Sequence, residues 1–502
     1  MLRKLLHKAG ELIMTKTAPQ TTEIQYLQRK IGQWLGSKYR HDQIDGERYY
    51  LGFHDILHRK RTMIGKDGEP VEVHNVPNEK IVDNLYADMV DTKNNYLLSQ
   101  PVTFVTENDT FQKELDKIID SNFLLKLKNI GEGSLNCGIS YLYPYYNESG
   151  ELKFKVFAGH SILPFWVDDE HDEAEMYVRY YEQEKKNSIT DEIEKRIEIY
   201  TTQGIDHYIL VGNTLMIDKD NPHEDYFTKD GVAYTWGDKI PLIPFRYNKF
   251  EQPLLRRCKS LQDAINLMTS DFCNNMQDDV RTTILVLENY DGENLGELRE
   301  KLALYGAIKV RSESGARGDV RTLRIEVDAN NYNAILALLK QAMVQNCRSF
   351  DSANLRLGGS PNNTQIQSFY MSMDLDANGQ IVHFNFALEK LFYFIKSHLK
   401  AIGKGDFMDE KVKVVFNKDM MISESEIMNN LINAGIRIPN KLLLEQCTFI
   451  NDVDEAMKLL EEEDSKLVDA LDPYANVQNK SANQSSKTNK AAESKLTKGL
   501  GK

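Results

Sequence analysis

The residues that most resemble catalytic machinery are two histidines four positions apart. His54 and His58 enclose Asp55, Ile56 and Leu57, and on an α-helix this spacing places both imidazoles on one face, as in zinc-dependent proteases. That chemistry uses a glutamate between the histidines, and the shorter Asp55 would not reach the metal-bound water in the same way. The sequence identifies no third ligand. A polar helix with its apolar residues packed inward is the favoured interpretation, and a metal-dependent nucleic-acid-processing hydrolase using His54 and His58 is the alternative.

Other motifs for catalysis are missing from the sequence. It contains no G-x-x-x-x-G-K-[ST], no G-x-G-x-x-G and no G-x-S-x-G, which would indicate phosphate cradles or a nucleophilic serine. The acidic runs at 168–172 and 461–464 are interpreted as solvated surface. We therefore expect no catalytic residue, no metal and no cofactor.

The composition narrows the classes of protein to which this chain could belong. The 502 residues carry 62 basic and 75 acidic side chains, for a formal charge of −13, which disfavours a dedicated high-affinity DNA binder. The five cysteines form no C-x-x-C pair, so buried thiols in a reducing compartment are expected. No export signal and no apolar run long enough for a membrane span is found.

One stretch, from Leu261 to Leu399, organises the rest of the chain. Apolar residues at helical spacing predict helices over 261–276, 328–350 and 364–398. A small α/β module fills the gap between the first two, with strands expected at 283–287, 307–310 and 322–327. The Gly/Asn/Pro-rich segment 351–363 cannot continue a helix. Long helices around a loop and a small module favour a mechanical role over a catalytic pocket.

The flanking regions complete an α+β prediction. Helices are expected at 81–98 and at 111–130, the second ended by Gly131. Residues 140–245 read as an antiparallel meander, with a hairpin turn at 147–150 and an extended edge at 239–245. Beyond residue 400, a strand at 412–416 precedes a small helical cluster, and the chain from 473 onward is disordered by composition. The fold class is α+β, arranged as a multi-segment elongated subunit.

Several short segments, taken in order, resemble a known family. They are Arg48-Tyr-Tyr-Leu-Gly52 with Arg59-Lys-Arg61, Asn95-Tyr-Leu-Leu-Ser-Gln-Pro-Val-Thr-Phe104, Lys239-Ile-Pro-Leu-Ile-Pro-Phe245 with Asn248, Leu287-Glu-Asn-Tyr-Asp-Gly-Glu-Asn294 and Asp374-Leu-Asp-Ala-Asn378. Over about residues 45–465 the chain resembles the portal proteins, or head-to-tail connectors, of tailed bacteriophages, of the type found in siphophages of Gram-positive bacteria. The Lys-rich tail falls outside the resemblance.

The resemblance implies a ring, usually a dodecamer, at one capsid vertex, through which DNA is packaged and ejected. It divides the chain into parts with names used in that family. These are a wing (1–250 and the long helix 364–404, with antiparallel strands), a stem of long helices (251–278 and 328–350), an α/β clip (279–327), a tunnel loop (351–363), a helical crown (405–465) and a disordered tail (466–502).

The same resemblance implies roles for particular residues. The tunnel loop would contact DNA without reading its sequence, through Asn354, Leu355, Arg356, Leu357, Ser360, Asn362 and Asn363. Without the resemblance, this segment would be a plain connection between helices. The clip would present a basic surface to partners, made of Lys309, Arg311, Arg317, Arg321 and Arg324, for which a solvated loop is the alternative. A bend in the long helix is expected at Asn378 and Gly379.

The implied partners are other copies of the chain, double-stranded DNA, terminase, scaffolding protein, the major capsid protein and a head-completion or adaptor protein, with no membrane involved. The expected location is the portal vertex of the virion, and the host cytoplasm during assembly. An acidic body repeated around a ring would repel DNA phosphate, so that the duplex slides. A scaffold protein with no DNA role remains a third possibility.

Overall fold

The computed structural model describes residues 21–64, 69–72, 77–185, 192–229, 232–278, 284–288, 312–313, 316–317, 319–323, 329–350, 363–418 and 457–460. The chain divides into two compact units, Met1–Ser360 with Gln367–Met420, and Pro361–Ile366 with Met421–Lys502. In the second unit the described residues are the helical ones at 363–366 and 457–460. All contacts discussed below lie in the first unit.

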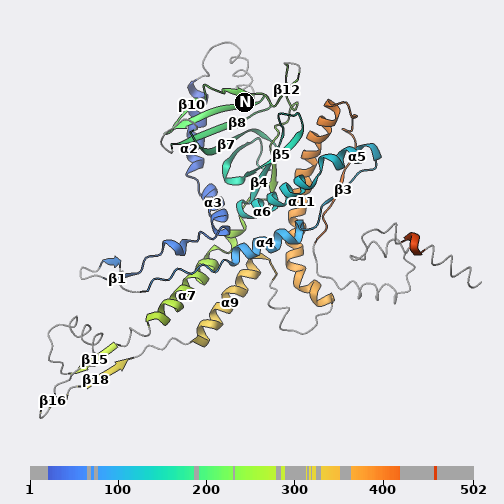
Figure 1. The fold of residues 1–502 in the computed structure, drawn as a ribbon. Coiled ribbons are helices and arrows are strands. Elements are labelled where there is room, and N and C mark those ends of the chain that lie inside the picture. The colour runs from blue at the N-terminus through green and yellow to red at the C-terminus, as the bar shows by residue number, and fades with distance from the viewer. Residues whose placement is uncertain are drawn as a thin grey trace, which may run out of the picture. The chain divides into compact units, whose positions relative to one another are not determined.

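Helices supply the long elements of the first unit (Figure 1). Their bounds are α2 (Thr21–Leu35), α3 (Lys38–Tyr50), η1 (Asp55–His58), α4 (Leu85–Leu98), α5 (Asp109–Ile118), α6 (Ser121–Cys137), η2 (Gly159–Ser161), η3 (Leu254–Arg257), α7 (Lys259–Asp278), α9 (Ala329–Cys347) and α11 (Asn363–Ala401). The predicted helices at 261–276, 328–350 and 364–398 are thus confirmed as α7, α9 and α11. No helix among the described residues combines the length and the apolar character needed to cross a membrane.

Antiparallel pairs join all the described strands. The strands are β1 (Thr62–Ile64), β2 (Pro70–Glu72), β3 (Thr103–Val105), β4 (Ile139–Tyr146), β5 (Leu152–Ala158), β6 (Ile162–Trp166), β7 (Ala174–Glu184), β8 (Ile193–Tyr200), β9 (Ile205–Val211), β10 (Thr214–Ile217), β11 (His223–Glu224), β12 (Phe227–Lys229), β13 (Val232–Tyr234), β14 (Ile243–Arg246), β15 (Ile284–Glu288), β16 (Ser312–Glu313), β17 (Ala316–Arg317), β18 (Asp319–Leu323) and β19 (Lys413–Val415). The largest sheet has the order β10-β9-β8-β7-β6, with β11 beside β9, and a second has the order β14-β4-β5. The predicted meander is confirmed, as is the edge position of the segment that holds β14.

Two layers bury the main apolar surfaces. Leu27 and Ile31 of α2 pack on the large sheet, and α6 lies between α4 and the sheet that contains β4 and β5 (Figure 1). The aromatic rings of Phe245 (β14) and Phe384 (α11) meet edge to face, 5.2 Å apart. These contacts fix α4, α6 and α11 against one another.

The predictions for two helices in this region were wrong at their ends. The helix expected from 81 begins at Leu85, after Asn84 caps it by accepting a hydrogen bond from the Ala87 N–H at 3.2 Å. Gly131 does not end the second helix, which is broken at 119–120 and continues as α6 to a left-handed Gly138. A Cβ on Gly131 would lie 2.2 Å from Asn94 Oδ1, so this glycine permits close packing of α6 on α4.

Gly46 of α3 permits an even closer approach. A Cβ there would lie 1.8 Å from the backbone oxygen of Asn136 in α6, and backbone cannot move aside as a side chain can. We predict that Gly46→Ala lowers the free energy of unfolding by at least about 2 kcal/mol, measured by chemical denaturation. Gly32→Ala in α2 is the matched control, because its new Cβ would meet only the side chain of Asn213, at 3.7 Å or more. Equal stabilities of the two variants would contradict this packing.

Candidate functional site

The described residues include only part of the sites expected from the sequence. Of the tunnel-loop residues, Asn354, Leu355, Arg356, Leu357, Ser360 and Asn362 lie outside the described residues, and Asn363 is the first residue of α11. Of the clip residues, Arg317 ends β17 and Arg321 lies in β18, while Lys309, Arg311 and Arg324 lie outside the described residues. The predicted clip strand at 322–327 overlaps β18, which begins earlier, spans Asp319–Leu323 and pairs with β15, and residues 324–327 lie outside the described residues.

The prediction that His54 and His58 share a helical face was wrong. Residues 55–58 form a 3₁₀ turn, and His54 precedes it in an extended conformation. The buried His54 ring directs Nε2 at the Tyr49 carbonyl (2.9 Å) and receives the Asn266 amide at Nδ1 (2.7 Å). Burial lowers the pKa of His54, which agrees with a neutral ring that accepts at Nδ1. Both nitrogens serve the fold, and the described residues hold no group of three or more metal-type ligands.

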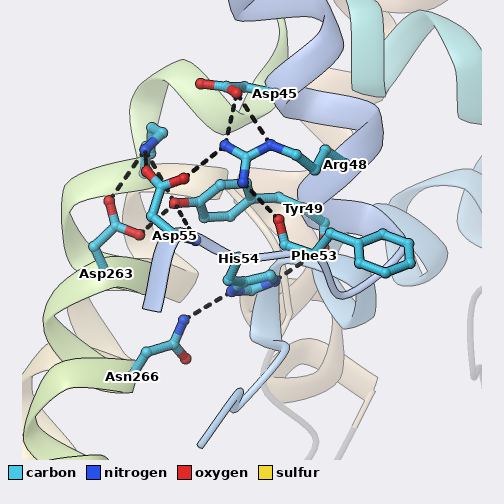
Figure 2. A network of polar contacts seen from close by, with 9 residues as sticks. Asp45, Arg48, Tyr49, Phe53, His54, Asp55, Asp263 and Asn266 are labelled. Carbon is cyan, nitrogen blue, oxygen red and sulfur yellow. Dashed lines mark hydrogen bonds and ion pairs between the residues drawn. The ribbon is translucent and has the colours of Figure 1, made fainter. Parts of the chain in front are cut away.

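The side chains around His54 form the polar network of Figure 2. Arg48 of α3 contacts Asp45 and Asp55 at 2.7 Å each, and donates to the Phe53 carbonyl at 2.7 Å. Lys259, at the start of α7, pairs with the other oxygen of Asp55. Asp55 therefore bridges a cation from α3 and a cation from α7.

Tyr49 joins the same two helices through its hydroxyl. It donates to Asp263 Oδ1 at 2.5 Å and accepts from Lys259 Nζ at 3.0 Å, while its ring stacks on His54 at 4.3 Å. Partial burial opposes ionisation of Asp55, yet Lys259 and Arg48 hold the pKa of that carboxyl well below its usual range. Asp55 is therefore charged throughout the physiological pH range, so its ion pairs link α3 and α7 over that whole range.

α7 also binds an extended segment, residues 77–84 before α4, which we name the strap. The side chains that do so recur every fourth residue of α7, and all are fully buried. They accept backbone N–H groups, in the pairs Asn274–Glu79 (2.7 Å), Ser270–Ile81 (2.9 Å), Asn266–Asp83 (3.0 Å) and Gln262–Tyr86 (3.0 Å). We name this set the α7 ladder.

The α7 ladder can form because the repeat distance along the helix is close to that along the extended strap. Four residues of an α-helix rise about 6 Å, and two residues of an extended chain advance about 6.6 Å. The alternate N–H groups of Glu79, Ile81 and Asp83 therefore meet successive side chains along one face of α7, and Gln262 receives the next contact from Tyr86, in the first turn of α4. This supplies hydrogen-bond partners for a strap that belongs to no sheet.

A second buried cluster lies where α4, α9 and α11 meet. Asp376 of α11 receives Lys93 Nζ of α4 at 2.7 Å and the Tyr247 hydroxyl at 2.6 Å. Arg348, just after α9, and Arg257 of η3 approach its other oxygen at 3.3 and 3.5 Å. The side chains of Lys93 and Asp376 are only 4% and 7% exposed.

Electrostatics make Asp376 the centre of this cluster. Burial alone would raise the pKa of Asp376, but the charge and hydrogen bond of Lys93 keep it below its usual value. Burial lowers the pKa of Lys93. The Asp376 carboxylate thus holds three cations from three segments of the chain, and we name this group the Asp376 hub.

The hub and an aromatic pair hold the chain on both sides of segment 351–362. On its N-terminal side, the Arg348 carbonyl accepts Lys93 Nζ at 3.3 Å. The rings of Phe350, before the segment, and Tyr370, after it, stack 4.5 Å apart. Tyr370 in turn stacks on Tyr96 of α4. The chain on the two sides of the segment is therefore held together by an aromatic pair and a buried charge.

The sequence held a signal for these residues that we did not use. Lys93 falls on the buried face of its helix with Tyr86, Met89, Val90 and Leu97, and a charge on an apolar face indicates a buried pair. Asp376 lies likewise beside the buried Met373 and Ala377. The prediction of α7 rested on its apolar stripe and did not consider its polar residues. In the structure, Met276 of the apolar stripe is 58% exposed, whereas the polar side chains of the α7 ladder are fully buried.

Together the network, ladder and hub lock helices into place, and they present no nucleophile activated by a base. The comparisons with known proteins agree with such a structural role. Residues 37–469 match the family described as phage portal protein, SPP1 Gp6-like. The chain is similar to the portal protein of Bacillus phage SPP1, with 27% identity over 427 residues, which is 84% of this chain and 83% of that protein. It is also similar to the portal protein of Clostridium phage phiCD119, with 26% identity over 452 residues, 87% of this chain and 96% of that protein.

Proposed function

Because the chain belongs to the SPP1 Gp6-like family of phage portal proteins, we propose that residues 351–363 are its tunnel loop and touch DNA in the channel. A phage portal protein is a structural protein, not an enzyme, and forms the DNA channel at a capsid vertex as a ring homo-oligomer. The metal-dependent hydrolase considered from the sequence is therefore excluded. What remains to assign is which residues of this chain do the work of the channel.

The observation that supports the proposal is that the chain is held together on the two sides of this segment. Phe350 and Tyr370 stack across it, and Arg348 is held by Asp376. Arg348 and Phe350 directly follow α9, and Tyr370 and Asp376 lie in α11, so a force on the segment would pass into both helices. Arg356 is the only basic residue from 351 to 363, which suits weak, sequence-independent phosphate contact that does not hold the duplex fast.

The remaining parts follow the same scheme. In our proposal α7 and α9 are the stem, residues 279–327 the clip, α2 to β14 with α11 the wing, and residues 405–465 the crown. A ring of twelve would dock terminase, and later a head-completion or adaptor protein, through the clip residues Lys309, Arg311, Arg317, Arg321 and Arg324. Contact with scaffolding and major capsid proteins, and a place at the virion vertex, complete the proposal.

The long helix has a weak point in this scheme. Residues Asn378 and Gly379 lie inside α11, which is helical on both sides of them. The Asn378 side chain is tied to Asp374 at 3.1 Å and to Lys418 at 2.6 Å. A bend at Gly379 during packaging stays a prediction, and it would tilt the N-terminal end of α11 together with the tunnel loop.

We predict that Arg356→Ala weakens DNA binding by purified rings and makes it less sensitive to salt. Each lost phosphate contact lowers the slope of log affinity against log salt by about one unit. The measurement is a titration of linear duplex DNA into rings at several salt concentrations. Arg29→Ala, on an exposed position of α2, is the control and should match the wild type. An unchanged slope for Arg356→Ala would argue against the tunnel-loop assignment, while intact rings would still support the portal.

A further inference from the structure

The side of α11 that faces away from its own core carries a line of large apolar residues. Their exposed fractions are Met371 62%, Leu375 60%, Val382 68% and Phe386 39%. Spacings of four, seven and four residues put them on one helical face. The opposite face packs inward through Met373, Phe384 and Leu388. We name the four exposed residues the outward stripe.

Charge distinguishes this face from the rest of the chain. The other exposed positions between Met371 and Phe386 are Ser372, Asn378 and Gly379, so the stripe itself carries no charged side chain. Two cations border it, because Lys418 reaches Asn378 at 2.6 Å and Lys390 lies over the Phe386 ring at 4.4 Å. The whole chain carries −13, and copies of an acidic protein repel each other wherever their charged surfaces meet. A stripe of apolar side chains without charges of its own is a place where two copies can approach.

Gly379 lies on the same face, and no packing contact within the described part of the chain requires a glycine there. A Cβ built there would meet nothing within 4 Å, so none of the described elements of this copy approaches too closely for a side chain. Glycine inside a helix is disfavoured relative to alanine. A reason for it outside the chain is the close approach of another backbone.

We propose that the outward stripe is a contact between neighbouring copies in the ring, with Gly379 at the point of closest approach. This rests on the portal assignment, because a ring homo-oligomer places another copy on each side of every subunit. Contacts in a ring of more than two copies are heterologous, so the stripe meets a different surface of its neighbour. The stripe begins shortly after the proposed tunnel loop, and the contact would therefore align successive loops around the channel.

The first test places one charge on the stripe. Val382→Glu should raise the protein concentration at which half of the chains form rings by at least tenfold, followed by light scattering after size exclusion and by negative-stain imaging. Val211→Glu is the matched control, because Val211 at the end of β9 is an exposed valine too, with an exposed fraction of 55%. This variant should assemble as the wild type does. Circular dichroism checks that both variants fold, as expected for exposed positions. Assembly of Val382→Glu at the wild-type concentration would overturn the contact, whereas a wild-type chain without rings would overturn the portal assignment itself.

The second test separates a contact from a bend at Gly379. A close approach predicts that ring formation weakens from wild type to Gly379→Ala, and further to Gly379→Leu, as the side chain grows. A bend alone predicts equal ring formation by all three, and that result would overturn the close approach. A photo-crosslinking amino acid at position 382 should in addition join two copies of the chain, and adducts to DNA alone would contradict the proposal.

Discussion

Asp376→Asn should lower the free energy of unfolding by about 3–5 kcal/mol, because it leaves Lys93 charged and buried without a counter-ion. The Lys93 ammonium is only 4% exposed and lies 2.7 Å from Asp376. The asparagine keeps the size of the side chain and can still accept a hydrogen bond from the Tyr247 hydroxyl. The loss of stability therefore reports the effect of the missing charge. Urea denaturation of the purified protein measures it.

Two further variants make the result specific to charge. Lys93→Met together with Asp376→Asn removes the stranded cation, and should recover at least half of the lost stability. Glu389→Ala, an exposed carboxylate on the same helix, should change stability by less than about 0.5 kcal/mol. If the double variant were no more stable than Asp376→Asn, the hub would be held by packing and not by its charges.

Asn266→Leu should cost about 2–4 kcal/mol and release the strap. Asn266 accepts the Asp83 N–H at 3.0 Å and donates to His54 at 2.7 Å, and leucine of similar size can do neither. Those buried groups would be left without partners. Chemical denaturation gives the loss, and hydrogen exchange should show faster exchange at the amides of Ile81 and Asp83.

Asn275→Leu provides the comparison for this prediction. Asn275 lies on α7 but is exposed, so the same substitution there should leave both stability and exchange in the strap unchanged. Protection of Asp83 that persists in Asn266→Leu would mean that the α7 ladder does not hold the strap.

The regular elements were predictable because local pattern decides them. Alternating apolar residues and the Asn147–Gly150 turn predicted the β4–β5 hairpin, which pairs from Tyr146–Leu152 to Ser140–Ala158. Helical spacing likewise predicted α7, α9 and α11. In each of these segments the spacing of apolar residues agrees with intrinsic propensity, so tertiary contacts had nothing to override.

Helix ends and polar contacts were not predictable, because distant residues determine them. Residues 81–84 have a helical pattern, yet the α7 ladder holds Ile81 and Asp83 extended from nearly 190 positions away. Gly131 resembled a helix stop, but it serves packing against Asn94. The spacing of His54 and His58 resembled that of a metal-binding pair on a helix, but residues 55–58 form a 3₁₀ turn and the two histidines do not share a helical face.

The hub shows how a resemblance can mark residues without explaining them. Asp374–Asn378 contributed to the family resemblance, but no role for Asp376 followed from the sequence. Its partners Lys93, Tyr247 and Arg348 come from three separate segments. The role of Asp376 became clear only from the fold, which brings those segments together.

The central claim, that this chain is a portal subunit, is tested most directly by negative-stain imaging of the purified full-length protein. Closed rings with an axial hole wide enough for duplex DNA are the predicted result, with size-exclusion light scattering giving the number of copies. A chain that stays monomeric at every concentration tested, with no ring in any image, would contradict the account.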